Sequence, residues 1–284
     1  MTDGGQECRR DSFEGWSRRH LDPARPGAPR RASLATVPEV VLGELARSAR
    51  GVIVLAVDGL GHRVAQRVWP GAALRTLTGT VPSTSATAWL TALTGAAPAE
   101  HGAVGMAYRA GDSLVLGVTG AVLAGDPRPR AVLKPLRRTV FERSPRPALA
   151  LARELDHLPG PWAPALLRGA RRAPAVDPDA LAAQASDPRR LAEAVAAQVS
   201  ATADRGLAWV YVNLDEYVHA HGFDEAVHEG MAALGAAAAD WARAGWTVLA
   251  HSDHGQVPVA PDPALARAWA ALDTPDECEL PAGG

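Results

Sequence analysis

Three continuous apolar runs constrain this chain most, because each of them leads into an aspartate. The runs and the aspartates that follow them are 52–57 with Asp58, 207–212 with Asp215, and 246–250 with Asp253. A short run that is apolar on every residue is typical of a parallel strand covered on both faces of a sheet. The three runs therefore predict buried strands that carry acidic groups at their carboxyl ends.

Helical patterns separate these runs. Residues 38–50 form an amphipathic pattern with Pro38 in its first turn, where a missing N–H costs nothing. Residues 177–202 and 225–244 are rich in alanine, and the second pattern stops at Gly245. Strands that alternate with helices predict an α/β fold, here a doubly wound, mostly parallel sheet with helices on both faces.

The chain has 284 residues, of which 47% are hydrophobic, enough to bury one large core. Residues 1–34 are rich in Arg, Pro and Gly without periodicity, so we expect a disordered arginine-rich arm followed by one folded domain over 35–284. The arm has no interleaved aromatic residues or recognition motif. We therefore expect no nucleic-acid partner.

Cysteine usage and hydropathy indicate where the protein works. Cys8 and Cys278 have neither the spacing of a disulfide framework nor that of a zinc finger, which fits a reducing compartment. No apolar run approaches the length that spans a bilayer. These features predict a cytoplasmic protein without a membrane partner, and they leave its oligomeric state open.

The aspartates are expected to meet, because the carboxyl ends of parallel strands line the ligand-binding crevice of an open sheet. A lone aspartate in such a place commonly caps a turn. Here Asp215 is joined by His219 four residues later, and Asp253 is followed directly by His254. Carboxylate with imidazole is a ligand set suited to Zn²⁺ or Mn²⁺. The pattern predicts a metal centre.

A hydroxyl-rich segment supplies a candidate nucleophile. Ser83 or Thr84 can cap a helix that runs to about Thr94, with Gly95 as its stop. A hydroxyl in that first turn, such as Ser85, lies in the positive field of the helix end, which also favours bound phosphate. Metal binding would make its alkoxide accessible near neutral pH, whereas without a metal the segment is an ordinary cap.

In their order along the chain, these motifs resemble the type I phosphodiesterase/nucleotide pyrophosphatase branch of the alkaline phosphatase superfamily. The resemblance covers about residues 50–256. Its motifs are Val57-Asp58-Gly59-Leu60, Val81 to Gly95, Pro98 to Gly105, Asp215-x-x-x-His219-x-x-Gly222 and Ser252-Asp253-His254-Gly255.

The resemblance implies an alkaline-phosphatase-like fold and a metal-dependent hydrolase of small phosphate mono- or diesters. It makes Ser85 the nucleophile, at the spacing where relatives usually carry threonine, with a phosphoseryl intermediate. It implies two divalent ions, zinc first and manganese as the alternative. The ligands it assigns are Asp58, Ser85, Asp253 and His254 for one ion, and Asp215 and His219 for the other.

Two departures from the family pattern leave a second interpretation open. Relatives complete the second metal site with a later histidine, but none follows His254, so we expect an incomplete second site and a fold that lacks its C-terminal part. Phosphodiesterase relatives often carry an asparagine three residues past the nucleophile, where this chain has Ala88. A catalytically weak or inactive relative that serves as an interaction module is the alternative.

Parts of the same pattern also occur in proteins with other functions. A phosphomutase of the superfamily stays open, since it also uses a hydroxyl nucleophile. A sulfatase is disfavoured because Pro and Arg do not follow Ser85 at the required offsets. Gly59-x-Gly61 is weak evidence for dinucleotide binding, as Val64 occupies the third glycine position. His101 and His251 are expected to support the structure or the ligands.

Overall fold

A computed structural model describes residues 32–117, 121–125, 137–152, 166–173, 183–257 and 260–270 of the chain. The predicted arm falls outside these residues except for its last three positions, so the division into arm and domain stays a prediction. Leu34 already belongs to the hydrophobic core, with 1% of its surface exposed. Cys8 and Cys278 lie outside the described residues.

The core of the fold is a five-stranded sheet with the order β6-β5-β7-β1-β8, in which every neighbouring pair is parallel. The bounds are β1 Gly51–Val57, β5 Ala148–Leu151, β6 Arg171–Arg172, β7 Gly206–Val212 and β8 Trp246–His251. The three predicted strands are β1, β7 and β8, which lie side by side with β1 in the middle. The predicted parallel α/β sheet is confirmed.

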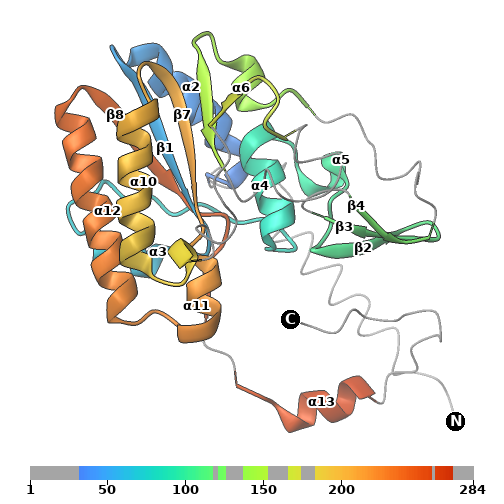
Figure 1. Ribbon diagram of the computed structural model, residues 1–284. Helices are drawn as coiled ribbons and strands as arrows, with labels where there is room; N and C mark the ends of the chain where they lie inside the picture. Colours follow the sequence, from blue (N-terminus) through green and yellow to red (C-terminus); the bar gives the residue numbers. More distant parts are fainter. Residues whose placement is uncertain are drawn as a thin grey trace, which may run out of the picture. The chain divides into compact units, whose positions relative to one another are not determined.

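Helices cover both faces of this sheet, because β1 is apolar on both sides. On one face Val52, Val54 and Ala56 belong to a core cluster with residues of α2 (Val37–Arg47) and α4 (Ser85–Thr94). On the other face Ile53, Leu55 and Val57 cluster with α10 (Pro188–Thr202) and α12 (Glu225–Arg243). Figure 1 shows α10 and α12 in front of the sheet and α2 behind it. The doubly wound arrangement is therefore confirmed.

The remaining described elements are short. The helical ones are η1 Leu34–Thr36, α3 His62–Val68, α5 Pro98–His101, α6 Val140–Arg143, α11 Asp215–His221 and α13 Pro263–Ala270. A separate antiparallel sheet is formed by β2 Ala107–Ala110, β3 Ser113–Leu116 and β4 Ala121–Ala124. No helix within the described ranges is long and apolar enough to cross a bilayer.

The helix expected over 177–202 is shorter among the described residues than its alanine-rich pattern. The continuous helix α10 starts at Pro188, because the side chain of Asp187 accepts hydrogen bonds from the amides of Arg189 and Arg190 and caps it. The proline sits in the first turn, where it removes no helical hydrogen bond. The local capping signal thus decides where this helix begins.

Candidate active site

Ser85 is the first residue of α4, as the hydroxyl-rich segment predicts. Thr84 holds the N-cap position with extended backbone and makes no side-chain cap, and Gly95 ends the helix in the left-handed region with φ of 72°. The Ser85 Oγ lies 3.0 Å from Nε2 of His254 and 3.5 Å from Oδ1 of Asp58. The hydroxyl of Thr84 lies instead 3.1 Å from that of Thr87. Of the two neighbouring hydroxyls, Ser85 is the one that faces the acids.

The carboxylate of Asp58 is buried directly after β1, with 3% of the residue exposed. Its Oδ2 accepts hydrogen bonds from the Tyr211 hydroxyl at 2.6 Å and from Nε1 of Trp89 at 3.3 Å. Its Oδ1 lies 3.6 Å from Nε2 of His254 and faces Ser85. Because two aromatic donors occupy one oxygen, the other is left directed at the nucleophile and the imidazole.

Asp253 follows β8 and is as deeply buried, with 1% exposed. Its Oδ1 accepts from the amide of Gly59 at 3.2 Å, which joins the loops after β8 and β1. Its Oδ2 accepts no hydrogen bond from any described residue and lies 3.2 Å from Nε2 of His254. A buried carboxylate oxygen without a donor is costly, and a cation would offset that cost.

The arrangement around His254 differs from that of a proton relay. A serine–histidine–aspartate triad uses opposite ring nitrogens, one toward the serine and the other toward the acid. Here the same Nε2 atom faces Ser85, Asp58 and Asp253. Three oxygen-bearing groups gathered at one imidazole nitrogen would suit a metal ion.

Asp215 and His219 meet as their four-residue spacing predicts, on the first turns of α11. Nε2 of His219 lies 3.0 Å from Oδ2 of Asp215, and 68% of the histidine side chain is exposed. The side-chain amide of Gln256 donates to the other carboxylate oxygen of Asp215. The pair therefore stands at the solvent side of the site, with Asp215 held from both sides.

One group of described residues could hold a metal ion, and it comprises Asp58, Asp215 and His254, whose ligand atoms all lie within 4.8 Å of one another. Burial, followed by the nearby charge of Asp253, raises the pKa of Asp58 to about 8. Several acids packed this closely fit a divalent cation. The group cuts across the predicted division of ligands, because Asp215 joins Asp58 and His254 while His219 is not part of it.

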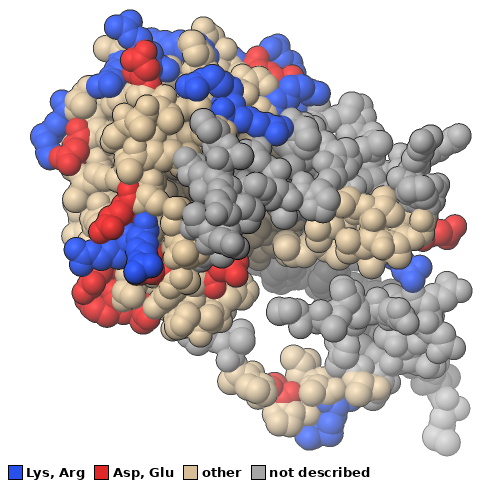
Figure 2. Space-filling model, in the orientation of Figure 1, with Lys and Arg blue, Asp and Glu red and all other residues tan. Residues whose placement is uncertain are grey.

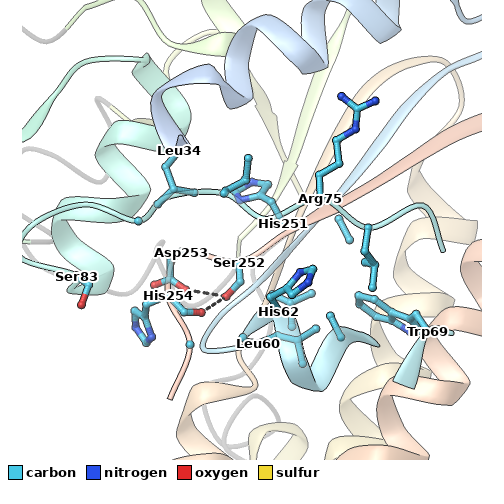
Figure 3. Close-up of a pocket in the computed structure, with 18 residues that line it drawn as sticks. Leu34, Leu60, His62, Trp69, Arg75, Ser83, His251, Ser252, Asp253 and His254 are labelled. Carbon is cyan, nitrogen blue, oxygen red and sulfur yellow. Dashed lines mark hydrogen bonds and ion pairs between the residues drawn. The ribbon is translucent and has the colours of Figure 1, made fainter. Parts of the chain in front are cut away.

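A cavity of about 300 Å³ lies behind the loop of residues 252–255 (Figure 3). Asp253 and His254 of the candidate site line it together with Leu60, Trp69 and His251, whereas Ser85 and Asp58 do not. The cavity therefore adjoins the candidate site on the side of Asp253 and His254.

The two histidines expected to support the site differ in their surroundings. Both ring nitrogens of His251 are buried without a hydrogen-bond partner among the described residues, and its ring packs edge-on against Trp89 at 5.5 Å. Burial lowers its pKa to about 4. His101 accepts from the amide of Ala103 through Nδ1, and its Nε2 lies 3.1 Å from the hydroxyl of Thr91. His101 therefore joins α4 to α5, and neither histidine belongs to the metal-binding group.

Three groups around the acids were not predicted from the sequence. They are Trp89 and Tyr211, which donate to Asp58, and Gln256, which donates to Asp215. A signal for Trp89 exists, because it lies one helical turn after the candidate nucleophile and so shares its face. Tyr211 places a polar hydroxyl near the end of a buried strand, which also calls for a partner. Ala88, where relatives often carry asparagine, is fully buried in the core.

Gly59 allows the close approach of the loop after β1 to Asp215. Its φ is 73°, and a Cβ there would lie 2.5 Å from Oδ1 of Asp215. We expect Gly59→Ala to displace that carboxylate and weaken zinc affinity by about 10-fold or more. Gly111→Ala is the matched control, because Gly111 has φ of 63° and open space around it. Competitive chelator titration measures both variants, and equal affinities would remove the steric role of Gly59.

Tyr211→Phe tests the orientation of the Asp58 carboxylate. The substitution removes the 2.6 Å hydrogen bond to Oδ2 and leaves the aromatic ring in place. We expect zinc affinity to fall by about 10- to 100-fold, as is typical when a partner of a metal ligand is lost. Tyr108→Phe, which removes a hydroxyl that has no hydrogen-bond partner among the described residues, provides the control. An unchanged affinity in Tyr211→Phe would show that Trp89 alone orients the carboxylate.

Comparison with known proteins gives a distant likeness. No family model and no curated protein matches the chain. Its structure is similar to murine ectonucleotide pyrophosphatase/phosphodiesterase 5, with 15% identity, a TM-score of 0.43, and coverage of 72% of this chain and 57% of that chain. An inactive variant of the murine protein in complex with AMP is similar too, with 13% identity, a TM-score of 0.40 and the same coverage.

The chain therefore spans little more than half the length of the murine protein it resembles. The parallel α/β sheet is established by the strand pairing of this chain, independently of that likeness.

Proposed function

We propose that this chain is a metal-dependent hydrolase of small phosphate esters, with Ser85 as its nucleophile. One observation carries the proposal. The Ser85 hydroxyl, at the N-terminus of a ten-residue helix, lies 3.0 Å from His254 and 3.5 Å from Asp58, two residues of the group that could hold a metal ion. A positioned hydroxyl, a helix N-terminus and a cation site together are suited to phosphoryl transfer.

In the proposed reaction, the first turn of α4 would bind the phosphate group and Ser85 would attack it. Unpaired amides in the first turn of α4 bind the phosphoryl oxygens and aim the phosphorus atom at Ser85. The serine hydroxyl gives up its proton to solvent and its oxygen forms a bond to phosphorus as the bond to the leaving alcohol oxygen breaks. The leaving oxygen takes up a proton from solvent. Water then attacks the phosphoserine, restores the hydroxyl and releases phosphate or a phosphomonoester. A bound divalent cation would stabilise the negative charge that develops on these oxygens.

The ligand set supports zinc as the first choice and manganese as the second, since it consists of carboxylates and imidazoles. One ion would be held next to Nε2 of His254, which lies within 3.6 Å of oxygens of the other predicted ligands Asp58, Ser85 and Asp253. A second ion would have Asp215 and His219, with the latter largely exposed. Fewer ligands bind more weakly, so we expect about one ion per chain to survive dialysis.

Hydrolysis and metal dependence are tested together. The chain is assayed with p-nitrophenyl phosphate and bis-p-nitrophenyl phosphate, before and after chelation, and with added Zn²⁺ or Mn²⁺. We expect chelation to abolish turnover and Zn²⁺ to restore it. Because the similar murine protein has been solved with AMP, p-nitrophenyl thymidine monophosphate is included as a nucleotide diester. A preference between the monoester and the diesters identifies the substrate class.

The same assay separates the alternatives. A phosphomutase would isomerise a sugar phosphate without net release of phosphate. An interaction module would show no metal-dependent turnover with any ester, and that result would overturn the proposed function.

A further inference from the structure

A second, larger cavity of about 720 Å³ lies at the amino-terminal ends of the strands, opposite the carboxyl ends that carry the candidate active site. It opens at the amino-terminal ends of β1, β5, β7 and β8, where Gly51 pairs with both Gly206 and Trp246. A seven-residue strand is roughly 20 Å long, so that distance separates the cavity from the metal-binding group. Four arginines contribute to the lining, namely Arg50, Arg146, Arg171 and Arg205. We call it the arginine cavity.

The charge of the arginine cavity is poorly compensated. Asp204 is the one acid in its lining, and no ion pair joins it to the four arginines in the described part of the chain. Four positive groups and one negative group leave a formal charge of +3. Figure 2 shows Arg and Lys side chains gathered along the top of the molecule, where Figure 1 places the amino-terminal ends of the strands.

Outside the arginine cavity, some of the described arginines pair with carboxylates and others do not. Seven of them form ion pairs with carboxylates, and these are Arg47, Arg137, Arg143, Arg168, Arg189, Arg190 and Arg243. In the arginine cavity, Arg50 donates instead to the carbonyls of Asp204 and Ala244 and lies over the ring of Trp246. Arg171 donates to the carbonyl of Thr202. Carbonyl acceptors orient a guanidinium but leave its full charge in place.

The guanidinium groups of Arg146 and Arg205 make no hydrogen bond or ion pair with the described residues. Their donors are therefore available to a ligand. A guanidinium presents a planar fork that matches the oxygens of a phosphate group, and several like charges in one concave site raise the local concentration of anions.

We propose that the arginine cavity binds a small polyanion through its phosphate groups, of the kind found in pyrophosphate and in the phosphate chain of a nucleotide. Its volume falls within the range of small-molecule sites. Trp246, the aromatic side chain in its lining, is already covered by Arg50, so no free ring remains to stack a base. The arginines would therefore recognise the ligand by its phosphate groups. This binding site does not depend on the proposed hydrolase activity.

Pyrophosphate binding to the full chain tests this proposal by isothermal titration calorimetry at 50 mM salt, after removal of metal so that the active site cannot chelate the ligand. We expect the double variant Arg146→Ala/Arg205→Ala to weaken binding by 10-fold or more. The control is Arg189→Ala/Arg190→Ala, which removes the same charge from exposed arginines that are paired outside the cavity. We expect that variant to bind as the unaltered chain does.

A parallel titration with ATP distinguishes a nucleotide from pyrophosphate as the ligand. Equal affinity for ATP and pyrophosphate would show that the phosphates alone are bound, and tighter binding of ATP would add a contact to the nucleoside. The proposal is overturned if pyrophosphate does not bind, if both double variants lose affinity equally, or if short duplex DNA binds while pyrophosphate does not.

Discussion

Ser85→Ala is expected to lower kcat by roughly 10³-fold or more, because it removes the atom that attacks phosphorus. The fold should persist, since the Ser85 side chain makes its contacts in the site and not in the core. Zinc content after dialysis should stay near that of the unaltered chain, as carboxylates and His254 supply the remaining ligands. The measurement is kcat on the best ester of the panel, with metal content determined on the same preparation.

Thr84→Ala is the matched control for the nucleophile, since it removes a neighbouring hydroxyl of the same helix turn. That hydroxyl lies 3.1 Å from the hydroxyl of Thr87 and has no contact with the acids. We expect kcat to change by about 3-fold or less. If Thr84→Ala is the inactive variant, the nucleophile has been placed one residue too late along the chain. Ser85→Thr should retain activity, since it keeps a hydroxyl at the same position.

Asp58→Asn is expected to lose both metal and activity, because the amide no longer supplies the anionic oxygen that faces Ser85 and His254. We expect bound zinc to fall below about 0.1 per chain after dialysis and kcat to fall by roughly 10³-fold. Full metal content in purified Asp58→Asn would remove this carboxylate from the ligand set.

The same substitution should stabilise the metal-free protein. The ordinary pKa of this carboxyl, 3.8, is raised to about 8 in the folded state by burial and by neighbouring acids. The contribution of Asp58 to the free energy of unfolding is therefore fully present below pH 3.8 and is lost as pH rises toward 8. Asparagine carries no charge at any pH. The gain from Asp58→Asn should grow over this pH range and reach roughly 2–5 kcal/mol.

Thermal unfolding in the presence of chelator measures this gain at a series of pH values. Asp112→Asn is the control, because Asp112 lies exposed in the turn between β2 and β3, away from the buried acids. A loss of stability in Asp58→Asn at pH 8 would show that the folded protein neutralises this carboxylate by another contact. Opposite signs for function and stability are expected of a group kept for binding a cation.

The elements that could be predicted from the sequence are those whose signal lies within the element itself, as an apolar run or a stop residue. The runs that became β1, β7 and β8 are apolar on every residue, and α12 carries its own stop at Gly245. β5 was not predicted, because four residues rich in alanine carry too weak a signal. It is a strand through its pairing with β7, in which Ala148 lies opposite Leu207. Such pairing is a long-range interaction that no local pattern contains.

Local patterns were enough to predict which groups stand at the strand ends and that Ser85 opens a helix, because apolar runs and capping signals act within a few residues. Which of these groups meet depends on how the strands and helices pack. The strand order sets β1 between β7 and β8, so that Asp58 comes within ligand distance of Asp215 and His254. Packing of distant segments also brings Tyr211 and Trp89 to one oxygen of Asp58. It gathers four arginines around one cavity at the amino-terminal ends of the strands. These contacts depend on lateral packing between distant segments, which hydrophobic periodicity along the chain does not encode.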